Sequence, residues 1–402
     1  MPSETFAETI SAAGVCDGPD AALNGLLSSV ELVDHHVHGI VRGAVDEAGL
    51  RDMLIESDRR SAADAAGYDS QVWFAVRRWC GPLLGLAPSA GIGEYLEARL
   101  TLTNEAVADR LLPPAGIGHL VVETGFRGGQ VSTPIELGER AGAPASRVVR
   151  LEALAEELIA TIGDPADYPT EFRRALSAEL HGPDAAVGTK TIVAYRGGFD
   201  RDLSAPPDEE VADAARAWSA ALQGGERPRL TDDLLLRFGI WSGIQSGRPL
   251  QVHTGFGDPD VDLHRADPLL LTDFIRQTEG QAPILLLHTY PFHRNAGYLA
   301  QMFPHVYLDV GLAINYAGAA AAGIVAESLE LAPFSKVLFS SDAWGAPELH
   351  LLGSWLWRRA MARIVGDWVA RGDWSRDDAE RLVRLVAGEN ARRVYQLPAV
   401  SS

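Results

Sequence analysis

Short apolar runs alternate with longer stretches of helical periodicity along most of the chain. Eight runs have the length and composition of buried strands, and they cover residues 31–38, 119–126, 147–154, 190–198, 249–257, 283–292, 305–311 and 336–343. Between most of them lies a stretch in which apolar residues recur with helical spacing. Alternation of strands and helices is typical of a parallel α/β fold. Eight such units predict a (β/α)₈ TIM barrel.

Helix-capping residues support this division of the chain. Residues 231–247 are expected to form a helix with Thr231 as its N-cap. Asp267, followed directly by proline, is expected to begin another. Near the end of the chain, Ser375 and Asp378 have the spacing of a capping box before a closing helix.

One connection is much longer than a barrel needs. Residues 43–118 separate the first predicted strand from the second, and they have mostly helical character. We interpret them as a helical insertion near the barrel mouth, within one domain that spans residues 1–402. An independent helical domain is the alternative interpretation.

Composition narrows the class of partner. The formal net charge is −19, which argues against nucleic acid and anionic membranes as partners. Cys16 and Cys80 do not make a disulfide framework. No run approaches the roughly 20 apolar residues that a membrane span needs, and the N-terminus has no signal-peptide pattern. We therefore expect a cytoplasmic protein that acts on a small molecule. A homo-oligomer is compatible with the sequence, although no stretch identifies an interface.

The first predicted strand ends in an unusual group of histidines. The chain reads Asp34-His35-His36-Val37-His38, which holds three of its eleven histidines. Because residues two apart in a strand share a face, His36 and His38 point to the same side. Two neutral imidazoles held in this way suit a divalent metal. A histidine buried for structural reasons is the alternative, so ligands from other strands must decide.

Three other predicted strands end in residues of the same kind. His253 follows the fifth strand, His288 the sixth and Asp342 the eighth. In a parallel barrel these ends meet on one face, where the catalytic residues of such barrels lie. Each residue by itself has an adequate structural explanation. Together with His36 and His38, however, they predict a site for zinc or a similar divalent ion.

This order of ligands resembles the amidohydrolase superfamily. The segments PLQVHTGFGDPD (249–260), HTYPFHRNAGYLAQMFPHVYLDV (288–310) and LAPFSKVLFSSDAWGAPE (331–348) resemble one branch of it. That branch comprises the amidohydrolase half of the nodulin/glutamine-synthetase-like fusion proteins and their free-standing bacterial relatives. The resemblance covers most of the chain, from about residue 31 to 397, and is most specific in the C-terminal half.

The resemblance implies a role for each candidate residue. His36, His38 and Asp342 would bind a first metal, and Asp342 would also act as the general base. In two-metal members the residues that match His253 and His288 bind a second ion. In one-metal members His253 completes the site, and His288 becomes an acid/base or a substrate contact.

Lys190 decides between one ion and two. In two-metal relatives a carboxylated lysine of the fourth strand bridges the ions, and VGTKTIVAYR resembles that strand. Burial beside cations favours the uncharged amine that carboxylation requires. Lys190 also precedes the apolar run TIVAY, so it could instead be a structural lysine at the far end of the strand. The number of ions, one or two, stays open at this point.

Three further residues are candidate substrate contacts. Arg196 follows the fourth strand, where its guanidinium could hold an anionic group through two N–H donors. Tyr290 lies two residues beyond His288, and Glu123 ends the second strand. A salt bridge or a packing role explains each of them equally well.

These predictions favour a metal-dependent hydrolase that cleaves a C–N bond, most simply an amide. A metal-activated water would attack, with Asp342 as the general base. The association of the resembling proteins with ligases suggests γ-glutamyl or other N-acyl amines as substrates. The alternatives are a one-metal decarboxylase of an aromatic or unsaturated acid, a uronate-type isomerase, and a non-catalytic barrel that retains the metal residues.

Overall fold

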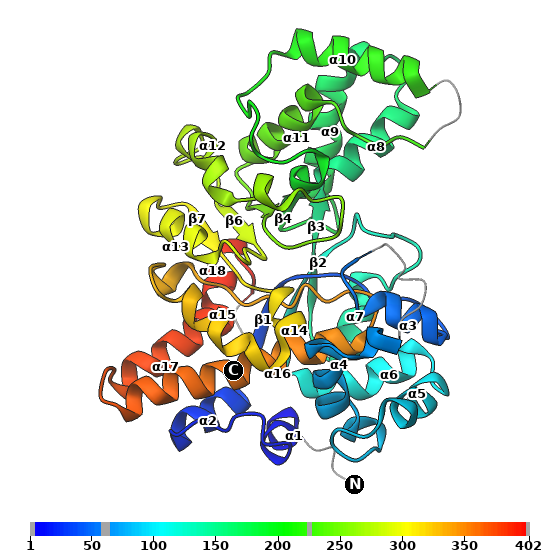
Figure 1. Ribbon diagram of the computed structural model, residues 1–402. Helices are drawn as coiled ribbons and strands as arrows, with labels where there is room; N and C mark the ends of the chain where they lie inside the picture. Colours follow the sequence, from blue (N-terminus) through cyan, green and yellow to red (C-terminus); the bar gives the residue numbers. More distant parts are fainter. Residues whose placement is uncertain (1–4, 58–64, 223–226, 399–402) are drawn as a thin grey trace.

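The centre of the molecule is a parallel sheet of seven strands that follow one another in chain order (Figure 1). The computed structural model describes residues 5–57, 65–222 and 227–398. The strands are β1 Leu32–Val37, β2 Ile117–Glu123, β3 Ala145–Arg150, β4 Gly188–Thr191, β5 Leu250–His253, β6 Ile284–Leu287 and β7 Val306–Leu308. The parallel α/β architecture expected from the alternation of apolar runs is therefore confirmed.

Residues 337–345 lie between β7 and β1 and connect the two edges of the sheet. On one side, Leu338 N donates to Leu308 O at 3.0 Å. On the other side, His35 N donates to Phe339 O at 3.2 Å. The curled sheet thus closes in the manner of a TIM barrel, with this segment in the place of an eighth strand.

The eighth apolar run, residues 336–343, is not a regular strand. Its hydrogen bonds to β1 continue as far as Asp342, whose N donates to His36 O at 3.1 Å. Asp342, however, has a φ of 48°. This value lies in the left-handed region, which an extended strand cannot include, and the regular ladder is broken there.

The fourth run is also shorter than expected. Of residues 190–198 only the first two belong to β4, and Val193–Arg196 forms a 3₁₀ turn. The reason is a buried carboxylate, Glu152, which accepts hydrogen bonds from the Thr191 hydroxyl at 2.6 Å and from Ile192 N at 2.9 Å. The backbone N–H of Ile192 is thereby taken from the ladder.

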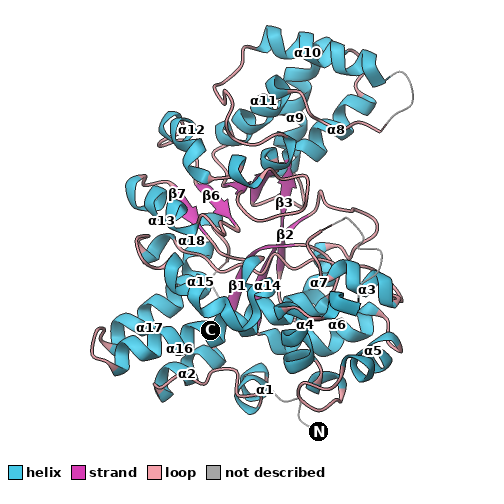
Figure 2. Ribbon diagram, viewed as in Figure 1, coloured by secondary structure: helices cyan, strands magenta, loops and turns pink. Residues whose placement is uncertain are grey.

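Helices surround the sheet (Figure 2). Those outside the first long connection are α1 Phe6–Ala12, α2 Ala21–Ser29, α7 Pro134–Ala141, α8 Leu151–Thr161, α9 Tyr168–His181, α10 Asp208–Ala221, α11 Asp233–Gln245, α12 Thr272–Gln277, α13 His293–Met302, α14 Ala313–Ala317, α15 Ala321–Ser328, α16 Pro347–Ala370, α17 Arg376–Arg384 and α18 Asn390–Tyr395. Among the helices that the structure describes, none has the length and the hydropathy of a membrane-spanning segment.

In the described part of the predicted insertion, residues 43–57 and 65–118, four α-helices lie between β1 and β2. They are α3 Glu47–Met53, α4 Gln71–Ala75, α5 Ile92–Leu100 and α6 Asn104–Leu111, and they gather beside α7 in Figure 1. Trp73 and Leu111 belong to the same apolar cluster as Leu352 of α16. This shared core is compatible with one domain, and the assignment of residues 43–118 as an insertion within it stays a prediction.

Capping residues begin several helices as expected, with one correction. Ser375 caps α17, where its hydroxyl accepts from Asp378 N at 3.1 Å. Asp267 caps the 3₁₀ turn that leads into α12. For α11 the cap is Asp232 and not Thr231, because the Asp232 carboxylate accepts hydrogen bonds from two N–H groups of the first turn.

Candidate metal centre

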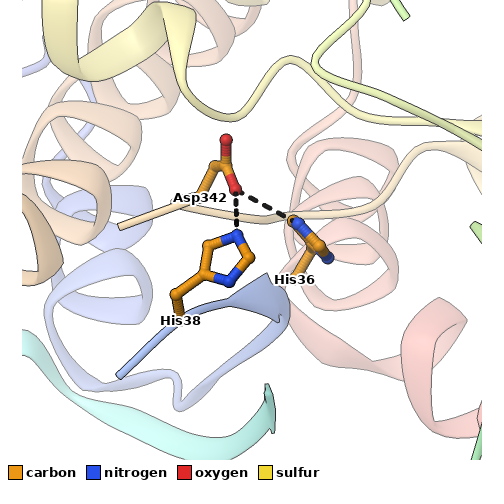
Figure 3. A group of neighbouring side chains, drawn as sticks. All are labelled: His36, His38 and Asp342. Carbon is orange, nitrogen blue, oxygen red and sulfur yellow. Dashed lines mark ion pairs between the residues drawn. The ribbon is translucent and has the colours of Figure 1, made fainter. Parts of the chain in front are cut away.

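His36, His38 and Asp342 converge at the carboxyl ends of the strands (Figure 3). His36 Nε2 lies 3.2 Å from Asp342 Oδ1, and His38 Nε2 lies 3.4 Å from the same oxygen. One ligand atom from each residue lies within 4.8 Å of the other two. The alternation of side chains along β1 therefore aims both imidazoles at one carboxylate, with the spacing of a metal site.

His253 and His288 complete the group around Asp342. His288 Nε2 lies 3.4 Å from Asp342 Oδ2, the oxygen that faces away from the β1 pair. The ring centroids of His253 and His288 are 4.8 Å apart. The four histidines and the aspartate all line one cavity of about 610 Å³. The structure thus brings together the ligands that the sequence placed on separate strands.

Burial determines the charges of these side chains. It lowers the pKa of His36 to about 3 and that of His288 to about 4, because an imidazolium loses its hydration there. The pKa of His253 also falls well below its usual range for the same reason. Burial opposes ionisation of Asp342, but the neighbouring His288 and His36 outweigh it and hold its pKa well below the usual value. Neutral imidazoles around an ionised carboxylate are the form that binds a cation.

Several buried nitrogen atoms in this group lack a partner. His253 Nε2 and both ring nitrogens of His288 make no hydrogen bond with any residue that the structure describes. Buried polar atoms are normally paired, so a cluster of such lone pairs needs an occupant. Imidazole and carboxylate ligands are those that zinc and similar ions take in proteins. The residues present therefore fit a divalent metal.

Lys190 lies within the same group. Its side chain is buried, and its Nζ lies 3.4 Å from His36 Nε2. Burial lowers the pKa of Lys190 to about 8. The alternative of a structural lysine at the far end of its strand is wrong, because β4 ends at Thr191, one residue later. Whether Lys190 bridges two ions stays a prediction.

Comparison with known proteins agrees with this geometry. Residues 203–397 match the family model described as Amidohydrolase. A protein of Lactobacillus casei described as a metal-dependent hydrolase is 25% identical, with a TM-score of 0.80 over 91% of this chain and 95% of its own. Residues 203–397 therefore belong to the amidohydrolase superfamily. The predicted family is therefore confirmed for this part of the chain, and its description agrees with the prediction of a hydrolase.

Two other similarities extend over different parts of the chain and support different conclusions. The protein fluG of Emericella nidulans is 31% identical in an alignment of 277 positions that covers 62% of this chain and 32% of fluG. The chain thus corresponds to about a third of that protein's length. A uronate isomerase of Bacillus halodurans has a TM-score of 0.59 at 14% identity, over 98% of this chain and 96% of its own. That likeness concerns the fold.

Gln251 holds the His36 ring with its Nε2 toward Asp342. Its Oε1 accepts a hydrogen bond from His36 Nδ1 at 2.8 Å, so that Nε2 faces Asp342. Its Nε2 donates to His35 O at 2.9 Å and to the Tyr395 hydroxyl at 2.8 Å. Partners of this kind fix the orientation of metal-binding histidines. The sequence analysis missed Gln251, although its position two residues before His253 places both on one face of β5.

The backbone at two of the candidate ligands, His288 and Asp342, is strained and held in place. His288 has a φ of 65° and Asp342 a φ of 48°, and such conformations cost about 1–3 kcal/mol each. Asp309 Oδ1 accepts from His288 N at 3.0 Å. The carboxylate of Asp34 accepts from Ser341 N at 2.9 Å and from its hydroxyl at 2.5 Å. These buried acceptors hold the two ligands in position.

Arg196 and Tyr195 line the cavity from the turn after β4. The Nη2 atom of Arg196 lies 3.5 Å from the carboxylate of Glu156. Tyr195, which the sequence analysis did not single out, packs against His253, with the two ring centroids 4.4 Å apart. A Cβ at Gly257 would collide with both the Tyr195 hydroxyl and His253 Nε2. Gly257 in the GFGD loop was the signal in the sequence for this close approach.

The other two candidate substrate contacts lie elsewhere. Glu123 is fully buried behind the cavity wall, where its Oε2 contacts Arg150 Nη2 at 2.5 Å and His38 Nδ1 at 3.4 Å. Tyr290 is not among the described residues that line the cavity, and its ring stacks on His293 with centroids 5.9 Å apart. The geometry thus gives Glu123 a supporting role and does not support substrate contact by Tyr290.

Proposed function

We propose that this amidohydrolase cleaves a C–N bond, most simply a carboxamide, in a small molecule. The observation that supports it is the convergence of histidines on Asp342 inside one cavity. Such a site combines ligands for a divalent ion with a base that is ionised at neutral pH.

Each residue has a defined task in this proposal. His36, His38 and Asp342 would hold one ion, zinc or a similar metal. His253 and His288 would hold a second, and carboxylated Lys190 would be shared by both. When bound, a divalent ion polarises a carbonyl oxygen and lowers the pKa of water to about 7.

Asp342 has the position and the charge for both proton transfers. One carboxylate oxygen faces the β1 histidines and the other faces His288. Its depressed pKa keeps it ionised, so it can accept the proton of the attacking water and pass it to the leaving nitrogen. His288 stays neutral near pH 7 and lies beside the carboxylate that carries the proton.

The proposal is tested by release of amine from a panel of γ-glutamyl and N-acyl amides. The panel follows from the resemblance to barrels joined to a glutamine-synthetase-like half. We expect amine release from protein loaded with zinc or manganese, and its loss in Asp342→Asn. Metal-loaded protein that releases no amine from any member would contradict C–N hydrolysis. Carbon dioxide release from carboxylic acids or conversion of uronates would instead support the decarboxylase or the isomerase.

The number of ions is tested separately through Lys190. We propose two ions bridged by the carboxylated lysine, because Lys190 Nζ lies beside His36 and its pKa is lowered to about 8. Elemental analysis with and without bicarbonate should give about two metals per chain, falling in Lys190→Met. One metal per chain, unchanged in the variant, would make the site a one-metal centre.

A further inference from the structure

Two buried arginines form the wall of the cavity beside β3 and β4. Arg150 ends β3, and Arg196 ends the turn that follows β4. Their side chains are 13% and 9% exposed, respectively, and both line the cavity that contains the metal ligands. The inner wall is therefore basic here, although the chain as a whole carries a formal charge of −19.

Both guanidinium groups have donors without partners. The Nε atoms of Arg150 and Arg196 are buried and make no hydrogen bond with any described residue. The charge of Arg150 is balanced by Glu123 through Nη2 at 2.5 Å, whereas Arg196 has a longer contact of 3.5 Å with Glu156. A buried guanidinium normally uses its donors, so the incomplete pairing of Arg196 indicates a missing acceptor.

We propose that Arg196, supported by Arg150, binds a carboxylate of the substrate at a point remote from the bond that is cleaved. The planar fork of a guanidinium matches a carboxylate through two parallel hydrogen bonds. The substrate class is then an amide that carries a second, ionised carboxylate. This statement of substrate class rests on the proposed function, whereas the carboxylate site itself does not.

Glu123 connects this carboxylate site with the metal centre. The same carboxylate oxygen contacts Arg150 on one side and His38 on the other. It therefore fixes the supporting Arg150 relative to the metal centre. A substrate that reaches both Arg196 and the metal centre must have a length that matches their separation. Replacing Arg150 would leave Glu123 buried without its ion pair, so Arg196 is the residue to change.

Arg229 provides a matched control in the same cavity. It lines the cavity as Arg196 does, but its side chain is 55% exposed, and its Nη2 pairs with Asp260 Oδ2 at 2.9 Å. Arg229→Gln and Arg196→Gln remove the same charge. A general effect of charge would appear in both variants, and a specific carboxylate site in Arg196→Gln.

The test measures binding of dicarboxylates by calorimetry to the metal-loaded protein. Malonate, succinate, glutarate and adipate are compared with the monocarboxylates of equal chain length, from propionate to hexanoate. One carboxylate of each ligand can meet the metal centre, and only the diacids have a second for Arg196. We expect one diacid to bind at least about 10-fold more tightly than its monoacid, and neighbouring lengths to bind less well.

The variants decide what causes that preference. Arg196→Gln should weaken binding of the preferred diacid by about 10- to 100-fold. It should leave the affinity for each monoacid within about twofold of that of the unmodified protein. Arg196→Lys should recover part of the loss, since it restores the charge but not the fork. Arg229→Gln should bind every ligand with an affinity within about threefold of that of the unmodified protein. Unfolding curves confirm that each variant is folded.

Other outcomes overturn the proposal. If the preference for diacids persists in Arg196→Gln, chelation of the metal explains it and the carboxylate site is absent. Equal binding of diacids and monoacids has the same consequence. Diacid binding that depends on Arg196, in a protein that cleaves no amide, would contradict C–N hydrolysis and leave the carboxylate site standing. Hydrolysis of amides without any dependence on Arg196 would support C–N hydrolysis and contradict the carboxylate site.

Discussion

His35 and His36 are neighbours in the chain, yet they belong to two different kinds of buried polar cluster. The ring nitrogens of His35 are both paired, Nδ1 with the Tyr395 hydroxyl at 3.1 Å and Nε2 with Asp309 Oδ2 at 3.0 Å. His36 Nδ1 is paired with Gln251, whereas its Nε2 faces the cavity, 3.2 Å from Asp342 Oδ1 and 3.4 Å from Lys190 Nζ. The difference separates histidines that complete the interior from those that leave ligand atoms available.

Asp309 and Asp342 show the same contrast, and it affects the stability of the fold. Asp309 accepts hydrogen bonds from Gly311 N at 2.8 Å and from the Ser340 hydroxyl at 2.9 Å, besides its contact with His35. Asp342 is surrounded by imidazoles that are neutral and partly unpaired. A fully bonded network stabilises the fold. A network that leaves polar atoms unpaired lowers stability, and ligand binding can recover it.

The largest expected effect comes from exchanging the two aspartates for asparagine. Asp342→Asn should lower hydrolysis by about 10³-fold, because a general base contributes about 10²–10⁴-fold, and should lower the free energy of unfolding by less than Asp309→Asn does. Asp309→Asn should lower that free energy by about 3–5 kcal/mol, since it breaks a buried pair. Urea unfolding and steady-state assays measure both. Equal loss of stability in the two variants would remove the distinction.

The histidines provide the second test of the comparison. His35→Asn should lower the free energy of unfolding by about 3–5 kcal/mol, because Asp309 loses its buried partner. The folded fraction of the His35→Asn variant should still bind metal. His288→Asn should lower the free energy of unfolding of metal-free protein by less than His35→Asn does, because neither ring nitrogen of His288 makes a hydrogen bond there, and it should lower metal content. Elemental analysis beside urea unfolding reports both quantities, and a stable His35→Asn variant would contradict the structural role.

Gln251 connects the two clusters, so its variants can separate them. Gln251→Leu should weaken metal binding by about 10- to 100-fold, the usual effect of losing a partner of a metal-binding histidine. Gln251→Glu keeps an acceptor for His36 Nδ1 but loses the donor to His35 O. It should retain metal affinity and still lower stability. A competition titration with a chelating dye measures the metal affinity. Unchanged metal affinity in Gln251→Leu would show that Gln251 does not support metal binding through His36.

The smallest effect is the pH dependence of the metal-free protein. The pKa values of His36 and His288 in the folded state, about 3 and about 4, lie below the ordinary value of 6.5. The unfolded chain therefore binds more protons below pH 6.5, and stability is lost as the pH falls from there. The slope is up to about 1.4 kcal/mol per pH unit for each histidine.

Urea midpoints at pH 7 and pH 5 measure this slope. His288→Asn, which lacks one of the titrating groups, should show a shallower loss than the unmodified protein. Equal slopes in the two proteins would show that His288 does not stay neutral in the folded state.

Much of the site could be predicted because strand periodicity and strand ends act locally. His36 and His38 share a side because side chains alternate along β1, and His253, His288 and Asp342 follow apolar runs whose carboxyl ends meet in a parallel barrel. What failed depended on other parts of the chain. β4 stops where Glu152 binds Ile192 N, a contact that no pattern within residues 190–198 reveals.

By itself, the sequence determined the parallel α/β barrel, the superfamily and the strands that carry the ligands, because hydrophobic periodicity and residue spacing encode them locally. The tertiary structure decided which polar groups are satisfied. It pairs His35 fully and leaves His288 unpaired, and it buries Glu123 behind the cavity wall while Arg196 lines it. These assignments depend on contacts between residues far apart in the chain, and a hydrogen-bond partner that distant leaves no periodic signal.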